Sequence, residues 1–94
     1  MKLTMFSDPG HAWLFVSQAQ LCTLGLTLKD FSKYSYHDRA GVYAEEDCDA
    51  AMVIKKHNQI LDCAPSIDYV DYPNETQYIR GLPRCGKTLT VKGA

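Results

Sequence analysis

The stretch GLPRCGKT at residues 81–88 satisfies the nucleotide-binding pattern G-x-x-x-x-G-K-[ST] at every required position. In such a loop, backbone N–H groups surround phosphates, and a helix beginning at the Lys-Thr pair directs its positive end toward them. Only residues 89–94 follow Thr88, far short of the roughly 12 residues at which an isolated helix becomes marginally stable, and Pro83 removes one N–H from the loop. We therefore interpret the pattern as a coincidence of spacing and predict no NTPase.

Asp8, His11 and Trp13 surround a tight turn, where an acid and a histidine are candidates for a metal or acid–base site. The intervening Pro9 and Gly10 complete Asp-Pro-Gly, which a β-hairpin turn requires irrespective of any chemistry. His11 alone cannot hold a metal, and Trp13 is typical of the core of a small sheet. We therefore predict no catalytic residue, metal or cofactor at this turn.

Residues 45–49 read Glu-Glu-Asp-Cys-Asp, and clustered carboxylates are what Mg²⁺ or Ca²⁺ requires. The run lacks the spacing of a calcium-binding loop and stands where a helix begins, so we expect it to stabilise the positive helix end. Asp47 is the predicted N-cap, with a contribution of about 0.5–2 kcal/mol. Flanking aspartates should raise the pKa of Cys48, so no reactive thiolate is expected. His57 falls on an apolar helix stripe and is expected to be packed, not metal-bound.

Hydrophobic periodicity and turn residues predict a ββαββαβ order of elements. Strand-like patterns occupy residues 2–7, 11–16, 33–36, 42–44 and 66–72. A capping box at 17–20 begins a short helix that stops at Gly25, and apolar positions at spacings of three and four over 50–61 indicate a second helix. This order predicts a small single α+β domain, with an antiparallel or mixed sheet and two helices packed on one face.

The charges are distributed unevenly along the chain. Residues 1–75 carry all 11 acids and six Lys/Arg, whereas residues 76–94 carry four basic residues and no acid. We predict an α+β domain over 1–73 and a basic, weakly structured tail over 74–94, which lacks periodicity. The net charge of −1 is too small for non-specific nucleic acid binding, and no apolar run approaches the roughly 20 residues of a membrane span. Four cysteines without paired spacing indicate a reducing, intracellular setting.

Five tyrosines fall on three of the predicted strands, which also carry acids. Because successive side chains of a strand point to opposite faces, some of these rings must point away from the helices. Such rings either cover a solvated sheet or contact a partner, and an acidic aromatic face suits a basic protein surface better than it suits phosphate. The predicted partner-binding residues are Tyr34, Tyr36, Tyr43, Glu45, Glu46, Asp49, Asp68 and Asp71.

The motifs SDPGHAWL, LxxLGL, YSY and VYAEEDCD, in this order over roughly residues 5–50, resemble a group of small uncharacterised proteins encoded in bacteriophage and prophage genomes. The resemblance implies no reaction, cofactor or site residue. It implies the setting of an accessory phage product that acts inside a bacterium. The final GKTLTVKGA departs from the pattern of the group.

Together these observations predict a phage accessory protein that binds and inhibits a bacterial host or defence complex without catalysis, as anti-CRISPR proteins do. We expect a host protein or nucleoprotein complex as the partner, in the host cytoplasm, with no direct nucleic acid binding and no membrane association. An exposed strand edge would also permit a homodimer. The alternative is a small metal- or ligand-binding enzyme that uses Asp8, His11 and the acids at 45–49.

Overall fold

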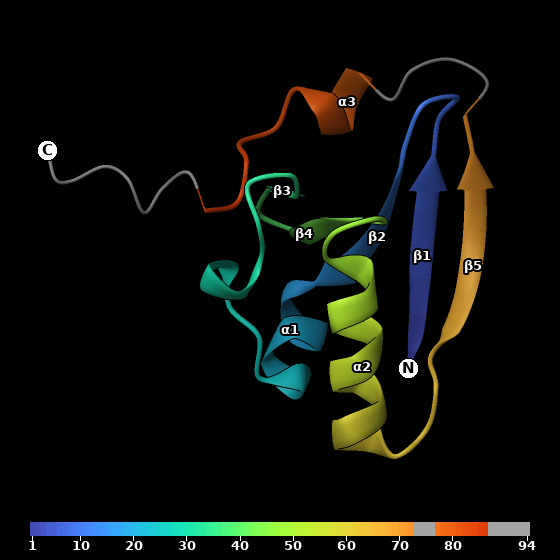
Figure 1. Ribbon diagram of the computed structural model, residues 1–94, viewed down its shortest axis with the longest axis vertical. Coiled ribbons are helices and arrows are strands. Elements are labelled where there is room, and N and C mark those ends of the chain that lie inside the picture. The colour runs from blue at the N-terminus through green and yellow to red at the C-terminus, as the bar shows by residue number, and fades with distance from the viewer. Residues whose placement is uncertain (73–76, 87–94) are drawn as a thin grey trace, which may run out of the picture.

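The structure, a computed structural model, describes residues 1–72 and 77–86 of the chain (Figure 1). Its elements in chain order are β1 (Lys2–Ser7), β2 (Ala12–Ser17), α1 (Gln18–Leu24), the 3₁₀ turn η1 (Leu28–Asp30), β3 (Tyr36–His37), β4 (Gly41–Glu45), α2 (Ala50–Leu61), β5 (Ser66–Asp71) and α3 (Gln77–Arg80). The predicted α+β domain with its ββαββαβ order is confirmed, and α3 is an addition to it. None of the helices described is long and apolar enough to cross a membrane.

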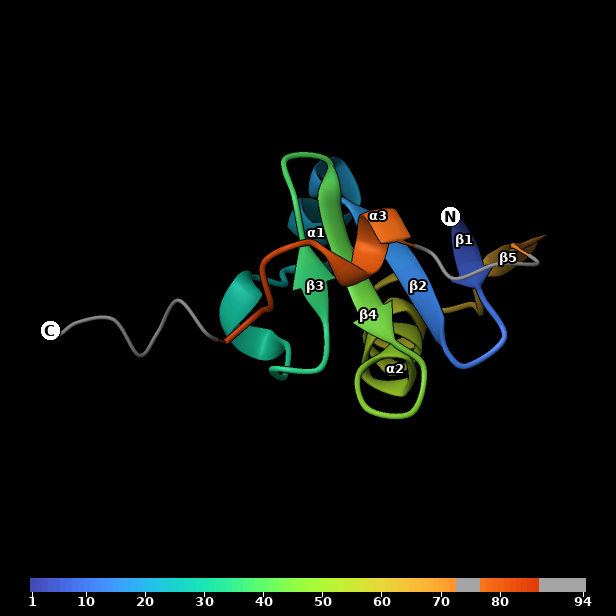
Figure 2. The same cartoon turned by 90° about the horizontal axis from the view of Figure 1, so that it is seen from above.

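The five strands form one mixed sheet in the order β3-β4-β2-β1-β5. Neighbouring strands are antiparallel except for β5, which runs parallel to β1 along its whole length. A parallel neighbour requires a crossover, and α2 supplies it between β4 and β5. Figures 1 and 2 show that β5 therefore stands at the edge of the sheet beyond β1.

Local sequence signals set both ends of α1. Ser17 Oγ accepts the N–H of Gln20 at 3.1 Å while Gln20 Oε1 accepts the N–H of Ser17 at 2.9 Å, which confirms the predicted capping box. Gly25 ends the helix at φ 68°, a left-handed conformation that favours glycine. The N-cap predicted for α2 is wrong by two residues, because Asp49 and not Asp47 occupies that position, and its carboxylate makes no capping hydrogen bond.

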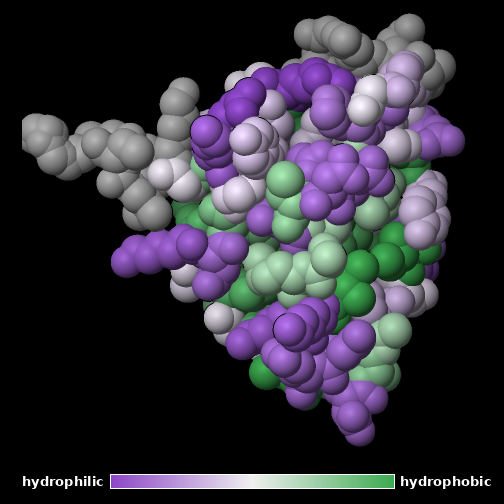
Figure 3. Space-filling model, in the orientation of Figure 1, coloured by the Kyte–Doolittle hydropathy of each residue, from purple (hydrophilic) through white to green (hydrophobic). Residues whose placement is uncertain are grey.

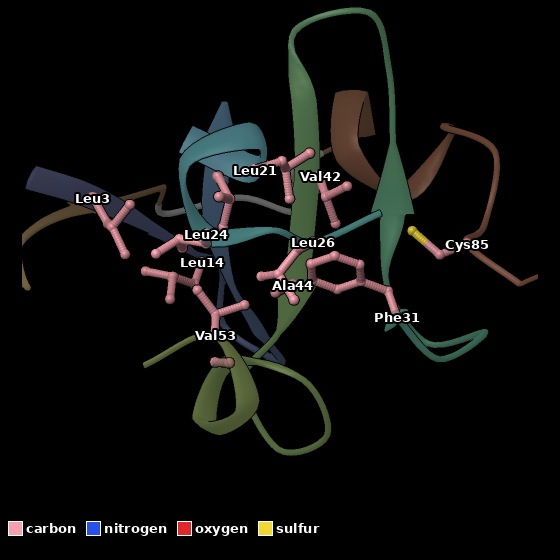
Figure 4. Close-up of a cluster of buried hydrophobic side chains, with 12 residues drawn as sticks. Leu3, Leu14, Leu21, Leu24, Leu26, Phe31, Val42, Ala44, Val53 and Cys85 are labelled. Carbon is pink, nitrogen blue, oxygen red and sulfur yellow. The ribbon is translucent and has the colours of Figure 1, made fainter. Parts of the chain in front are cut away.

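Helices α1 and α2 pack on one face of the sheet, as predicted, and enclose the main core (Figure 4). Leu14 points from the central strand β2 toward Leu24 of α1 and Val53 of α2, and Val42 of β4 belongs to the same cluster. His57 lies on the same stripe of α2, fully buried, with Nδ1 2.7 Å from the carbonyl oxygen of Cys63, so the prediction that it is packed is confirmed. The buried residues of this core are Leu3, Leu14, Val16, Leu21, Leu24, Leu26, Phe31, Val42, Ala44, Ala50, Val53 and Cys85.

The opposite face of the sheet carries a second, aromatic core. Trp13 and Tyr43 alternate along their strands with residues of the main core and therefore point the other way, and Tyr36 is paired with Tyr43 across β3 and β4 and shares its face. Ile79 of α3, which is 3% exposed, packs on these rings. Residues 77–86, which include α3, thus cover this face, and we call them the C-terminal strap.

The C-terminal strap continues along β3, at the edge of the sheet opposite β5. The N–H of His37 donates to the carbonyl of Pro83 at 3.0 Å, and Tyr36 forms an antiparallel bridge with Arg84. The strap therefore closes the β3 edge. No strand of the described chain pairs with the outer side of β5, which leaves that edge open.

The predicted domain boundary at residue 73 is corrected by this packing. Residues 77–86 fall in the predicted weakly structured tail, yet Ile79 and Cys85 are buried in the two cores. The apolar side chains of Ile79, Leu82 and Cys85 recur every third residue, a short pattern that the adjacent glycines, proline and arginines obscure in the sequence. The other tail positions, 74–76 and 87–94, lie outside the described residues, as do the Lys and Thr of the 81–88 motif.

Replacing Ile79 with alanine should lower the free energy of unfolding by about 2–5 kcal/mol, because the change removes buried methyl groups and leaves a cavity. Ile60, which is 50% exposed on α2, is the matched control, and I60A should cost about 1 kcal/mol or less. Urea unfolding followed by the fluorescence of Trp13, the one tryptophan of the chain, measures both losses. Equal losses would contradict the burial of the strap.

Candidate functional site

Four of the eight residues predicted to bind a partner are buried, each 9% exposed or less: Tyr36, Tyr43, Glu45 and Asp49. The expectation of one continuous acidic, tyrosine-bearing outer face is therefore wrong. For the two tyrosines the C-terminal strap is the physical reason, because it covers the face to which β3 and β4 direct them. The four predicted residues that are exposed are Tyr34, Glu46, Asp68 and Asp71.

Asp49 belongs to an internal hydrogen-bond network. Its Oδ2 accepts the N–H of Ser32 at 2.9 Å and the hydroxyl of Ser32 at 2.8 Å, and the hydroxyl of Ser35 donates to the same oxygen. Ser35 Oγ in turn accepts the N–H of Glu45 at 3.0 Å. The carboxylate thereby ties the loop before β3 to the start of α2, which explains why it does not cap its own helix.

Glu45 closes the loop that follows β4. Its Oε1 accepts the N–H groups of Asp47 and Cys48 at 2.8 and 2.9 Å, and its Oε2 lies 3.7 Å from Nδ1 of His11. Desolvation, and then hydrogen bonding to Glu45 and the surrounding negative charge, raise the pKa of the Cys48 thiol, which is the expected direction. Nowhere in residues 1–72 and 77–86 do three His, Cys, Asp or Glu side chains lie close enough together to hold a metal ion.

Asp8 and His11, the residues of the alternative enzyme hypothesis, line two different recesses: Asp8 lies with Asp71 and Tyr72, and His11 with Trp13 and Glu45. The Asp8 side chain has no exposed surface, and its two oxygens accept hydrogen bonds from Nε and Nη2 of Arg80 at 2.9 and 3.0 Å. Asp8 Oδ1 also accepts the N–H groups of Gly10 and His11, each at 2.9 Å, which closes the β1–β2 turn. The Asp8 carboxylate therefore anchors the C-terminal strap to this turn instead of facing a substrate.

A recess of about 360 Å³ opens on the aromatic face of the sheet, where β2 begins and β4 ends. This volume lies at the lower end of the range found for ligand pockets. Its aromatic walls are Trp13, Tyr34 and Tyr36. Its acidic and polar walls are His11, Glu45, Asp47 and Cys48.

Two arginines of the C-terminal strap form the basic wall of this recess. The guanidinium carbon of Arg80 lies 5.3 Å from the ring centre of Trp13, and that of Arg84 lies 5.4 Å from the ring centre of Tyr36. Asp8 neutralises Arg80. Arg84, by contrast, forms no salt bridge with any described residue, and its Nη1 donates a long hydrogen bond of 3.4 Å to the carbonyl of Lys33.

Trp13 places an unmet hydrogen-bond donor beside the recess. The side chain is 2% exposed, and its indole N–H has no acceptor among the described residues. A buried donor without a partner costs about 1–3 kcal/mol, so native proteins leave few of them. The donor, the rings and the free charge of Arg84 make this recess the candidate ligand site.

A polar cluster around Asp38 fastens α3 to the β3–β4 turn. Asp38 Oδ2 accepts the hydroxyls of Tyr78 and, at 3.2 Å, of Tyr43, while Oδ1 accepts the N–H groups of Ala40 and Gly41 at 2.8 and 3.2 Å. Partial burial acts to raise the pKa of Asp38. The four hydrogen bonds outweigh that effect and leave the pKa below its ordinary value of 3.8.

The open edge strand β5 carries two of the three predicted acids that are exposed. Asp68 lies 3.3 Å from Nζ of Lys2 in an exposed ion pair, and Asp71 accepts the hydroxyl of Ser7. Tyr69 is 73% exposed, the most of any large hydrophobic residue described. This edge is therefore the candidate protein-binding surface.

Sequence reasoning missed Tyr78, Arg80 and Arg84 as site residues because it assigned them to the tail. The available signal was charge, since basic residues without neighbouring acids follow an acidic body and require partners. Comparisons of the chain with protein-family models, with curated proteins and with solved structures find no match. The resemblance to phage proteins stays a prediction from sequence.

Replacing Asp8 with alanine should lower the free energy of unfolding by about 3 kcal/mol or more, because it removes a buried bidentate ion-pair partner and the acceptor of two turn N–H groups. D68A is the matched control, since its ion pair with Lys2 is largely exposed and should contribute about 1 kcal/mol or less. Guanidinium unfolding of both variants measures the difference. Similar losses would show that Arg80 does not anchor the strap.

The stability of the protein should fall in acid partly through Asp38. Because hydrogen bonds hold its folded pKa below the ordinary 3.8, this stabilisation is complete above pH 3.8 and is lost as the pH falls through the folded pKa. D38N should be less stable than the wild type at neutral pH, and the difference should narrow below pH 3.8. Thermal melts between pH 2.5 and 7 test this, and a difference that stays constant over the range would contradict it.

Proposed function

We propose that this protein binds another protein without catalysis, by accepting an extended, basic segment of that partner alongside β5. The single observation that carries the proposal is the open β5 edge, which contrasts with the β3 edge that the C-terminal strap closes. Addition of a strand to an exposed sheet edge is a common mode of protein recognition, in which backbone hydrogen bonds supply affinity and side chains supply specificity.

The backbone of β5 offers hydrogen-bonding groups on its outer side. The N–H groups of Ser66 and Tyr72 donate inward to carbonyls of β1 and its turn, at 3.1 and 2.9 Å. Because alternate residues of a strand direct these groups to opposite sides, Ile67, Tyr69 and Asp71 direct theirs outward. These three residues therefore provide the edge with which a further strand would pair.

The side chains of β5 favour a basic occupant. Asp68 and Asp71 point to opposite faces of the strand, so a paired segment would meet one carboxylate on each face. The ion pair of Asp68 with Lys2 is largely exposed and weak, so a cation of the partner can replace Lys2 at little cost. A second copy of the chain would instead bring the same two acids to the edge. Repulsion between like charges makes a second copy a less favourable occupant than a basic segment.

Apolar contacts are also available next to this edge. Figure 3 shows hydrophobic side chains reaching the surface between α2 and the strands β1 and β5. Met5 of β1, Ile54 of α2 and Ile67 of β5 are half-buried and pack against the main core, and Tyr69 shares a face with Ile67. A segment paired with β5 can therefore bury apolar area as well as form backbone hydrogen bonds.

The resemblance to phage proteins supports an inhibitor of a bacterial host or defence complex in the host cytoplasm. Host nucleoprotein complexes carry basic surfaces that normally meet phosphates, and an acidic strand that occupies such a surface excludes the nucleic acid. The exposed Glu46 adds to the negative surface of the chain. The rival enzyme hypothesis has less support, since Asp8 is neutralised by Arg80 and lines a different recess from the one that His11 lines.

Proline at position 69 tests strand addition directly. Y69P removes one outward N–H without removing an inward one, so the fold should tolerate it while the edge is blocked. Y69V is the matched control, because it loses the same ring and keeps the N–H. Each protein is immobilised and exposed to bacterial lysate at low and high salt, and bound proteins are quantified by mass spectrometry.

We expect the wild type to retain a partner protein at low salt and to lose it at high salt. Y69V should retain at least part of this binding, whereas Y69P and the double variant D68K/D71K should lose it. The same partner bound equally by Y69P would rule out pairing with β5. A dimer in light scattering that Y69P abolishes would show that a second copy occupies the edge instead.

A further inference from the structure

We propose that the recess between the C-terminal strap and the start of β2 binds a small organic anion, namely a carboxylate or phosphate group attached to a planar aromatic body. This site is separate from the proposed function, because its lining residues come from β2, β3, β4, the loops next to them and the strap, whereas the binding edge is β5. Binding of the anion in this recess therefore requires no protein partner at β5.

Arg84 supplies the main attraction for the anionic group. Its guanidinium lies against Tyr36 and forms no salt bridge with a described residue, so its charge is uncompensated. A guanidinium stacked on a ring keeps its N–H edge available and binds carboxylate or phosphate through two parallel hydrogen bonds. The bridge between the backbones of Arg84 and Tyr36 fixes the position from which this side chain extends.

The indole N–H of Trp13 is the second, independent observation. It is a buried donor without an acceptor among the described residues, and Trp13 lines the recess. The indole nitrogen has almost no exposed surface, so an acceptor atom of the ligand can reach it only after a side chain that covers it moves. An anion that makes this contact satisfies a donor that the protein leaves unmet, which favours an acceptor ligand over a cation.

The aromatic walls determine the body of the ligand. Tyr34 is half exposed at the recess, and Trp13 and Tyr36 form its other two rings. Planar aromatic groups pack on such rings in stacked or edge-on geometry. A ring attached to the anion would therefore bind more tightly than the bare anion.

The acidic wall is weaker than its residue types indicate. Glu45 already accepts two backbone N–H groups and faces His11, whereas Asp47 is exposed and makes no salt bridge with a described residue. Asp47 therefore opposes an anion without being committed to the fold. Removal of the Asp47 carboxylate should therefore strengthen the binding of an anion and weaken the binding of a cation.

The test uses the whole chain labelled with ¹⁵N, since the one tryptophan yields one indole N–H signal at the site. The probes are benzoate and phenyl phosphate, with inorganic phosphate and neutral benzamide for comparison. The variants are R84Q and D47N, and R39Q is the matched control, because Arg39 is an exposed arginine of the β3–β4 turn outside the recess. Unchanged backbone spectra establish that each variant folds.

We expect saturable shifts of the indole signal with benzoate or phenyl phosphate, and whichever binds tighter identifies the anionic group. R84Q should weaken this binding about tenfold or more and D47N should strengthen it, while R39Q leaves it unchanged. Binding of benzamide as tight as that of benzoate, no effect of R84Q, or weaker binding in D47N would each overturn the proposal. Absence of a saturable shift with either aromatic anion would overturn it as well.

Discussion

The ion pair between Arg80 and Asp8 is the contact on which the remaining architecture depends, because it joins residues 72 positions apart at the turn of the first hairpin. The same carboxylate accepts two turn N–H groups, so one buried side chain fixes both the hairpin and the C-terminal strap. With the strap in place, Ile79 seals the aromatic face, and the chain beyond it reaches the β3 edge. Without it, Trp13 and the tyrosines around it would face water, at a cost proportional to the apolar area exposed.

The strap also determines which edge of the sheet stays available. An unpaired edge is a hazard that proteins usually block with charges, short strands or covering segments. The β3 edge is short and covered, whereas β5 is six residues long and protected only by exposed side chains such as Asp68 and Asp71. Negative charge at that edge opposes pairing with another copy and favours the basic segment that we propose as the occupant of β5.

Local signals were sufficient to predict most of the fold. The capping box at Ser17, the left-handed Gly25 and the apolar stripe of α2 each act within a few residues, and the structure contains all three. The candidate site was less accessible to sequence reasoning, because Tyr36 and Tyr69 have the same alternating context and opposite burial. A distant segment decides which of them is covered. Asp49 likewise differs from Asp47 only through Ser32 and Ser35, which the chain brings to it by folding.

The near-neutral net charge of the sequence conceals two regions of opposite sign. Folding places the basic residues of the strap against an acidic body, but the compensation is unequal, since Arg80 is paired with Asp8 and Arg84 is left with a ring and a carbonyl. One guanidinium thus stays unneutralised in the recess, while the carboxylates of β5 stay exposed beyond β1. Arg84 lies beside β3 and the carboxylates lie on β5, at opposite edges of the sheet, and Coulombic attraction is screened over about 8–10 Å at physiological salt, so each of the two proposed sites would act on its ligand independently of the other.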